Sequence, residues 1–204
     1  PRRSLPMEPM QTEERRLTVE RNVPVDALYM AFHMCSRNHP DYYAFDMLSD
    51  LLSSGRSSRF VQHLVQDKQI FNSIDAYISG SIDNGLFHIV GKPAPEKTLK
   101  EAEKAIWEEL ALLTEGSIDE NELEKVKNRY ESEQIFNNLN YLNVATNLAY
   151  FELIGKAEDI NTEVKKYRSV TQEQIKRAAK QTFLPENCSV LYYKAAAKGA
   201  SHTP

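Results

Sequence analysis

Apolar and polar residues alternate along two early stretches of the chain, from Arg16 to Arg21 and from Asp26 to Cys35. Successive side chains of a strand point to opposite faces, so a period of two predicts a strand with one buried face. We therefore predict two strands, hinged at Asn22-Val23-Pro24. The apolar set of the second strand is Leu28, Met30, Phe32 and Met34.

Helical spacing replaces this alternation after His39-Pro40 and stops at Gly55. Proline suits the first turn of a helix and glycine the position just past its end. A second helix is predicted from Ser57 to Lys68, with Gly55 capping the first helix and Ser57 or Ser58 capping the second. The apolar face of the second helix is Phe60, Val61 and Leu64.

A period of two returns from Phe71 to Ile82 and from Leu86 to Gly91, with Asp83-Asn84-Gly85 between the two runs. Asn-Gly between alternating runs is a strong hairpin signal. Beyond it, Ser117 with Glu120 and Thr171 with Gln174 have the spacing of capping boxes, which mark helix starts. The remaining predicted elements are helices over residues 96–114, 119–137, 139–154 and 172–183, and a last strand over residues 188–193.

Helices that cluster between strand pairs predict an α+β fold, with a mostly antiparallel sheet and helices packed on one face. Residues 1–14 hold three prolines and no periodic pattern, so we interpret them as a linker or arm. Residues 15–194 are expected to form one domain and residues 195–204 a tail, which suits a length of 204 residues.

Composition removes several classes of function. The chain has 25 basic and 29 acidic residues, a net charge of −4, and no basic block, so we expect no nucleic-acid partner. No apolar run approaches the roughly 18 residues of a membrane-spanning helix, so no membrane partner is expected. Cys35 and Cys188 lie too far apart for a zinc ribbon and are either bridged or free.

The five histidines form neither H-E-x-x-H nor the inverted H-x-x-E-H of zinc peptidases. His33 and Cys35 share one face of a predicted strand, and His88 lies on the hairpin, but no fourth ligand completes a metal site. No G-x-S-x-G nucleophile motif occurs either. We therefore predict no catalytic residue, no metal and no cofactor in this chain.

Three polar features remain open to interpretation. Arg56 and Arg59 could bind a substrate carboxylate or pair with surface acids. The segment from Phe136 to Phe151 is rich in asparagine and tyrosine, which indicates a surface that faces peptide backbone or a poorly helical segment in water. A further group alternates with lysine and predicts a solvated helix face: Glu101, Glu103, Glu108 and Glu109.

The run from Leu51 to Phe60, Leu-Leu-Ser-Ser-Gly-Arg-Ser-Ser-Arg-Phe, resembles a specific segment of the insulinase/pitrilysin (mitochondrial processing peptidase-like) zinc metallopeptidases. Leu64 and Asp67-Lys68-Gln69-Ile70 continue this resemblance into the next strand. Residues 170–175 and 183–187 resemble the closing helix and last strand of the family. The resemblance spans roughly residues 14–193.

The resemblance implies half of a clamshell that is built from paired homologous α+β domains around an extended peptide. One domain of such a pair carries the H-x-x-E-H zinc motif, and the other contributes an arginine and a tyrosine that contact substrate. This chain is similar to the second, zinc-less type. Its tyrosine position falls on Asn72 and its arginine position on Gln66 or Val65, so both side chains are replaced.

We therefore expect a non-catalytic half that encloses peptide and needs an H-x-x-E-H partner domain, on the same polypeptide or separate, for proteolysis. Zinc is expected only in that partner. The residues expected to contact the peptide substrate are Gln66, Asn72, Arg56 and Arg59. The loss of both arginine and tyrosine leaves a second interpretation open, a structural or assembly subunit with no proteolytic role.

Overall fold

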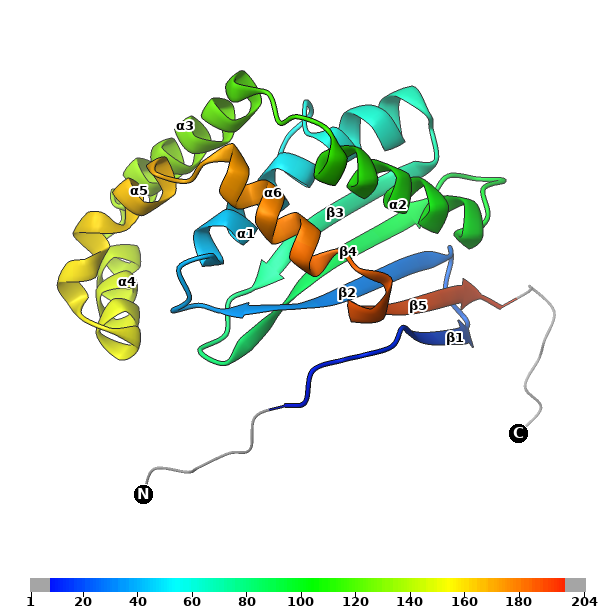
Figure 1. Ribbon diagram of the computed structural model, residues 1–204, viewed down its shortest axis with the longest axis horizontal. Helices are drawn as coiled ribbons and strands as arrows, with labels where there is room; N and C mark the ends of the chain where they lie inside the picture. Colours follow the sequence, from blue (N-terminus) through cyan, green and yellow to red (C-terminus); the bar gives the residue numbers. More distant parts are fainter. Residues whose placement is uncertain (1–7, 197–204) are drawn as a thin grey trace.

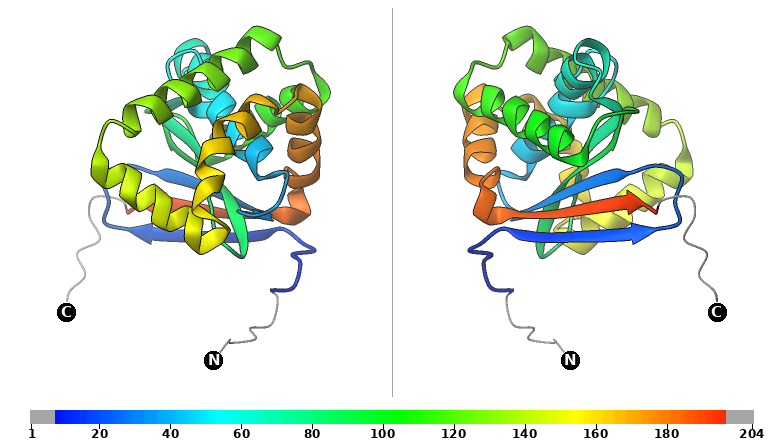
Figure 2. Two further views of the ribbon diagram at one scale, coloured as in Figure 1. Left: turned by 90° about the vertical axis from the view of Figure 1, so that its left-hand side faces the viewer. Right: turned by 90° about the vertical axis from the view of Figure 1, so that its right-hand side faces the viewer.

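The computed structural model describes residues 8–196 and contains a five-stranded sheet with helices on one face (Figures 1 and 2). The strand order is β1-β5-β2-β4-β3. β1 runs parallel to β5, and every other neighbouring pair is antiparallel. The strands are β1 (Arg15–Arg21), β2 (Ala27–Ser36), β3 (Phe71–Ser79), β4 (Asn84–Pro93) and β5 (Cys188–Ala195). The predicted α+β class is confirmed.

The helices occupy the sequence between the strand pairs, as the periodicity predicted, and α5 is an addition that was not predicted. Their bounds are α1 (Tyr42–Ser53), the π-helix η1 (Phe60–Asp67), α2 (Leu99–Glu115), α3 (Glu120–Asn137), α4 (Tyr141–Ile154), α5 (Ile160–Arg168) and α6 (Gln172–Thr182), with short 3-10 turns η2 (Ala157–Asp159) and η3 (Pro185–Asn187). None of the helices in residues 8–196 has the length and apolar character needed to cross a membrane.

The core lies between the sheet and the helices, and the alternation of β2 places its apolar set there. Leu28, Met30, Phe32 and Met34 are all buried, as predicted. The Phe32 ring packs edge-on against Phe183, at 5.1 Å between ring centroids, and against Trp107 at 5.7 Å. This packing holds the middle of β2 against the helices, and the chain continues from the end of the strand into Arg37 and α1.

The hairpin between β3 and β4 is confirmed, but its turn is shifted from the predicted residues. Ser79 pairs with Leu86, and residues 80–83 form the connection. Asn84 and Gly85 already belong to β4, where they pair with Ser36 and Met34 of β2. β4 therefore begins earlier than the hairpin pattern predicts, because its first two residues pair with β2. A hairpin signal alone does not predict pairing with a strand outside the hairpin.

Two predicted helix caps are wrong, while the Thr171–Gln174 capping box is confirmed. Asp119 caps α3 by accepting a hydrogen bond from the Asn121 N–H at 2.9 Å, so Ser117 does not. The Ser58 hydroxyl donates to the Gly55 carbonyl at 2.7 Å and does not cap the following helix. Both departures follow from competing local hydrogen bonds of short polar side chains.

The two cysteines, for which the sequence left both states open, are free thiols. Cys188 is buried on β5 and Cys35 is half-buried on β2. Burial raises the pKa of the Cys35 thiol to about 11 and that of Cys188 to about 12. At neutral pH both therefore remain protonated and act as small apolar side chains.

Candidate functional site

The turn between η1 and β3 separates two of the four residues that we expected to contact substrate, Gln66 at the end of η1 and Asn72 at the start of β3. Phe60 and Leu64 are buried and hold η1 against the core. The Lys68 N–H donates to the His63 carbonyl and the Ile70 N–H to the Leu64 carbonyl, which closes the helix. Gln69 then takes a left-handed conformation, with φ of 50°, and directs the chain into β3.

Gln66 and Arg56 lie together on the surface at this end of the domain. Both side chains are exposed, and the Gln66 amide donates to the Arg56 carbonyl at 3.4 Å. This contact joins η1 to the loop that follows α1. The exposed amide can offer both a donor and an acceptor to a peptide backbone.

Asn72 occupies a β-bulge at the start of β3. Its neighbours Phe71 and Ser73 pair with Pro93 and Lys92, and Asn72 has no cross-strand partner. The side chain is exposed. A bulge re-aims a side chain out of the regular alternation, and bulges are frequent beside binding sites.

Arg59 is held inside the domain by an ion pair with α3. Its Nε and Nη2 each donate to a Glu122 carboxylate oxygen at 2.9 Å, and Nη2 also reaches the Ser117 carbonyl at 3.4 Å. The hydrogen bonds to Glu122 raise the pKa of Arg59 above its usual value. Arg59 therefore fixes the start of η1 against α3.

The predicted solvated face of α2 is wrong for Glu103 and Glu109, which are both buried. Glu103 accepts hydrogen bonds from Arg16 and Tyr192. Burial opposes its charge, but these bonds outweigh it and lower the pKa of Glu103. Oε1 of Glu109 shares a hydrogen bond with His63 Nδ1 at 2.9 Å, while Oε2 has no partner among the described residues. Both glutamates are buried beside partners that lie far away in the sequence. The spacing of charges along one helix does not reveal such partners.

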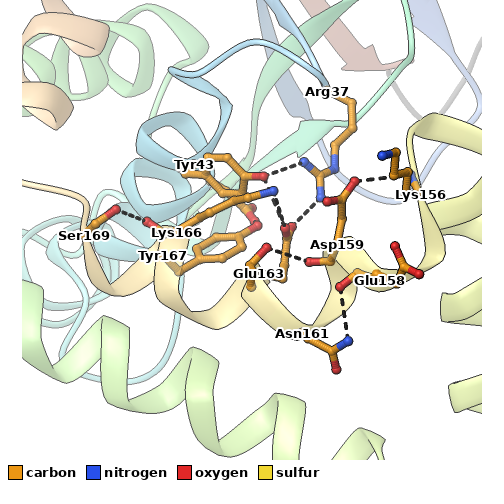
Figure 3. Close-up of polar contacts among 12 residues, drawn as sticks. Arg37, Tyr43, Lys156, Glu158, Asp159, Asn161, Glu163, Lys166, Tyr167 and Ser169 are labelled. Atoms are coloured by element: carbon orange, nitrogen blue, oxygen red, sulfur yellow. Dashed lines mark hydrogen bonds and ion pairs between the residues drawn. The ribbon is translucent and has the colours of Figure 1, made fainter.

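A second polar cluster lies where β2 ends against α1 and α5 (Figure 3). Arg37 and Glu163, both buried, form an ion pair between positions 126 residues apart in the chain. The Tyr43 hydroxyl donates to Glu163 at 3.2 Å, and the Arg37 guanidinium lies 4.4 Å from the centre of the Tyr42 ring. Burial would lower the pKa of Arg37, but Tyr43 and Glu163 outweigh it and raise the pKa.

Asp46 and Tyr167 extend this cluster toward α3. The Tyr167 hydroxyl donates to Asp46, and the Tyr167 ring stacks on Tyr130 at 3.6 Å between centroids. Burial raises the pKa of Asp46, and the hydrogen bond from Tyr167 only partly opposes this. Burial and the charge of Asp46 likewise raise the pKa of Tyr167. The pair is therefore a buried hydrogen-bonding unit between α1 and α5.

A cavity of about 330 Å³ opens beside this cluster, between α1, α3, α4 and α5. Asn137, Asn138 and Asn147 line it, together with aromatic rings such as Tyr130 and Tyr150. Part of the asparagine-rich segment thus faces a polar cavity. Such a lining can bind uncharged polar groups, including peptide amides. Among residues 8–196 no three His, Cys, Asp or Glu side chains are grouped so that they could hold a metal ion.

Asp50, one turn beyond Asp46 on α1, provides a pH-dependent test of this buried acidic region. Burial and the nearby Asp46 charge raise its pKa to about 6, against about 3.9 in an unfolded chain. The folded state then binds this proton more tightly, so the contribution of Asp50 to stability falls as the pH rises between about 4 and 6. Asp50→Asn should flatten this decline in urea titrations at stepped pH. An equally steep decline in the variant would contradict the assignment.

Sequence reasoning missed the buried polar cluster completely. Arg37, Tyr43 and Asp46 lie near the predicted start of a helix, where charged and aromatic residues are ordinary. Their partners Glu163 and Tyr167 are on α5, a nine-residue helix that was not predicted. No local signal connects two segments more than 100 residues apart.

Comparison with known proteins places the chain among peptidase homologues. The family model described as the peptidase M16 inactive domain matches residues 1–130. The uncharacterised zinc protease YmxG of Bacillus subtilis is 25% identical over 179 residues, which are 87% of this chain and 43% of that protein. The zinc protease PqqE of Helicobacter pylori is 22% identical over 92% of this chain. The chain thus spans less than half the length of these relatives.

Solved structures share the fold. A protease from Helicobacter pylori superposes with a TM-score of 0.87 at 22% identity, over 92% of this chain and 46% of that chain. An inactive peptidase domain from Bordetella parapertussis superposes with a TM-score of 0.78 at 17% identity, over 91% of this chain and 99% of that chain. These likenesses confirm the α+β fold.

Proposed function

The chain belongs to the family of peptidase M16 inactive domains, which confirms the resemblance read from its sequence, and we propose that it is the non-catalytic, peptide-enclosing half of a zinc metallopeptidase. The family match is the observation that carries this proposal. The sequence supports it, because it holds no H-x-x-E-H motif that could bind zinc and activate water.

Proteolysis in this proposal requires a homologous zinc-bearing domain. The relatives are more than twice as long as the part that the chain matches, which leaves room for a second domain of similar size. The zinc ion would be held there, and this chain would close the other side of the peptide.

The residues proposed to contact peptide are Gln66, Asn72, Arg56 and Arg59. The exposure of Gln66 and Asn72 supports the proposal, as does the bulge that turns Asn72 away from its strand pairing. Neutral amides bind a peptide carbonyl more weakly than a charged donor does. Their role in this proposal is to position the peptide, not to stabilise charge in the transition state.

Reconstitution with a co-expressed homologous H-x-x-E-H domain tests this function. The chain alone should retain substoichiometric zinc after dialysis and leave a quenched fluorescent peptide uncut, whereas the pair should cleave it. Gln66→Ala with Asn72→Ala should then lower turnover by less than about tenfold, or about 1.4 kcal/mol. The matched control changes two exposed amides elsewhere, Asn22→Ala with Gln181→Ala.

Two results would overturn the proposal. One zinc per chain that survives dialysis would mean that this domain holds metal itself. A loss of a hundredfold or more in the Gln66 and Asn72 variant, without loss in the control, would make these amides catalytic participants.

The second candidate function, a structural or assembly subunit, is favoured by one observation. Amides stand where substrate-contacting arginine and tyrosine are expected, at Gln66 and Asn72. A stable complex with the zinc-bearing domain that gains no peptidase activity over that domain alone would support this alternative.

A further inference from the structure

Another polar cavity, of about 370 Å³, lies between η1, α2 and the start of α3. It shares no lining residue with the cavity beside Arg37. Its wall includes His63 of η1, Glu109 of α2 and Lys125 of α3. Small-molecule sites usually enclose roughly 300–1,000 Å³, so a ligand of this cavity is small.

Glu109 is the unusual residue of this wall. Its side chain is 1% exposed, and among residues 8–196 His63 is the only basic side chain that pairs with it. That contact uses Oε1. Oε2 is the one buried side-chain nitrogen or oxygen in the described part of the chain that has no hydrogen-bond partner. A carboxylate only accepts hydrogen bonds, so Oε2 requires a donor.

The two permanent cations of the cavity wall have other partners. Arg59 donates to Glu122 at 2.9 Å through both Nε and Nη2. Lys125 donates to the carbonyl and the hydroxyl of Ser57, at 3.2 Å and 2.8 Å. Within residues 8–196 neither of them forms an ion pair with Glu109. Glu109 is therefore a buried acid without a permanent counter-ion, which a folded domain normally avoids unless the group has a function.

The backbone of η1 indicates a binding site independently. η1 is a π-helix, in which the Lys68 N–H donates to the His63 carbonyl five residues earlier. π-helical turns are rare and occur frequently at functional sites. Gln62 and His63 of this helix both line the cavity. The unusual helix and the unpaired acid thus meet at the same place.

We propose that this cavity binds a small organic cation, a primary ammonium or guanidinium group that donates to Oε2 of Glu109. An anion would be repelled by this carboxylate. A neutral donor would supply a hydrogen bond without the opposite charge, and charge-assisted hydrogen bonds are roughly twice as strong as neutral ones. The site does not depend on the proposed peptidase function. Its wall holds three carboxylates and two permanent cations: Glu109, Asp119 and Glu122, with Arg59 and Lys125.

Proton NMR of the 204-residue chain, titrated with methylguanidinium chloride at constant pH and ionic strength, tests the proposal. The ring signal of His63, identified by its loss in His63→Gln, should shift in a saturable way, because His63 contacts Glu109 in the cavity wall. N-methylurea, a planar neutral analogue with N–H donors, should bind at least about tenfold more weakly. Equal binding of the two compounds, or no saturable shift, would overturn the proposal.

Glu109→Gln removes the charge but keeps the size of the side chain and an acceptor for His63. This variant should bind methylguanidinium at least about tenfold more weakly than the native chain. The matched control is Glu108→Gln, at the neighbouring exposed position of α2, which should bind normally. Undiminished binding by Glu109→Gln would contradict the proposed site.

Thermal unfolding without ligand separates binding from a purely structural role of Glu109. Glu109→Gln should unfold at the native temperature or above it, because the change removes a buried charge that lacks a donor at one oxygen. A fall of more than about 4 °C would show that the carboxylate stabilises the fold, and it would overturn the proposal.

A third titration identifies the source of the cation. N-acetyl-argininamide presents the same guanidinium group on a peptide-like backbone. Binding as tight as that of methylguanidinium would assign the cavity to a basic side chain of a peptide, and markedly weaker binding would assign it to a free small cation. Either result supports a cation site, provided that Glu109→Gln abolishes the difference between charged and neutral probes.

Discussion

Replacing Phe32 with alanine should lower the free energy of unfolding by about 3–5 kcal/mol. The Phe32 side chain is fully buried in the centre of β2, and its ring contacts both Phe183 of the α6–β5 connection and Trp107 of α2. Truncation removes buried apolar surface and leaves a cavity between the sheet and the helices. The side chains around this cavity belong to different elements, so they cannot all move inward to fill it. Urea unfolding followed by circular dichroism measures the loss.

The matched control is Phe136→Ala, because Phe136 is 69% exposed at the end of α3. This change should cost less than about 0.5 kcal/mol. Similar losses for the two variants would show that the alternation in β2 does not define the core.

The strands were predictable because a half-buried strand must alternate. Met30 and Phe32 face the core while Tyr29 stays partly exposed, and this contrast is present in the sequence itself. α5 was not predicted, although Ile160, Val164 and Tyr167 recur at helical spacing along its nine residues. Its contact with the domain also depends on Glu163, a charged side chain that is buried against α1 and the end of β2.

The candidate site was likewise predictable only in part. The resemblance predicts Gln66 and Asn72 as contact residues, because the lengths of helix, turn and strand around them match the family pattern. It gave no indication that Arg59 pairs with Glu122 or that Glu109 is buried. Charged residues spaced by three or four along a helix look solvated until a distant element covers them, and that information is absent from local spacing.

Replacing Arg37 with methionine should lower the free energy of unfolding by about 3–5 kcal/mol. The change keeps an apolar side chain of similar length but removes the guanidinium that pairs with Glu163. Glu163 then stays buried with the Tyr43 hydroxyl and the more distant Lys166 as its remaining partners. The loss arises mostly from this uncompensated charge, because burying a carboxylate without its counter-ion costs more than the pair itself contributes.

The double variant Arg37→Met with Glu163→Met separates this cause from a simple loss of packing. Removing both charges leaves no unpaired ion, so its stability should return to within about 1.5 kcal/mol of the native chain. The coupling energy from the four proteins should therefore be at least about 1.5 kcal/mol. Arg129→Met with Glu133→Met, an exposed ion pair of the same residue types on α3, should show a coupling energy of less than about 0.5 kcal/mol. If the Arg37 and Glu163 losses instead add, the two side chains stabilise the domain by packing, and the polar cluster is not the electrostatic link between β2 and α5 that its geometry indicates.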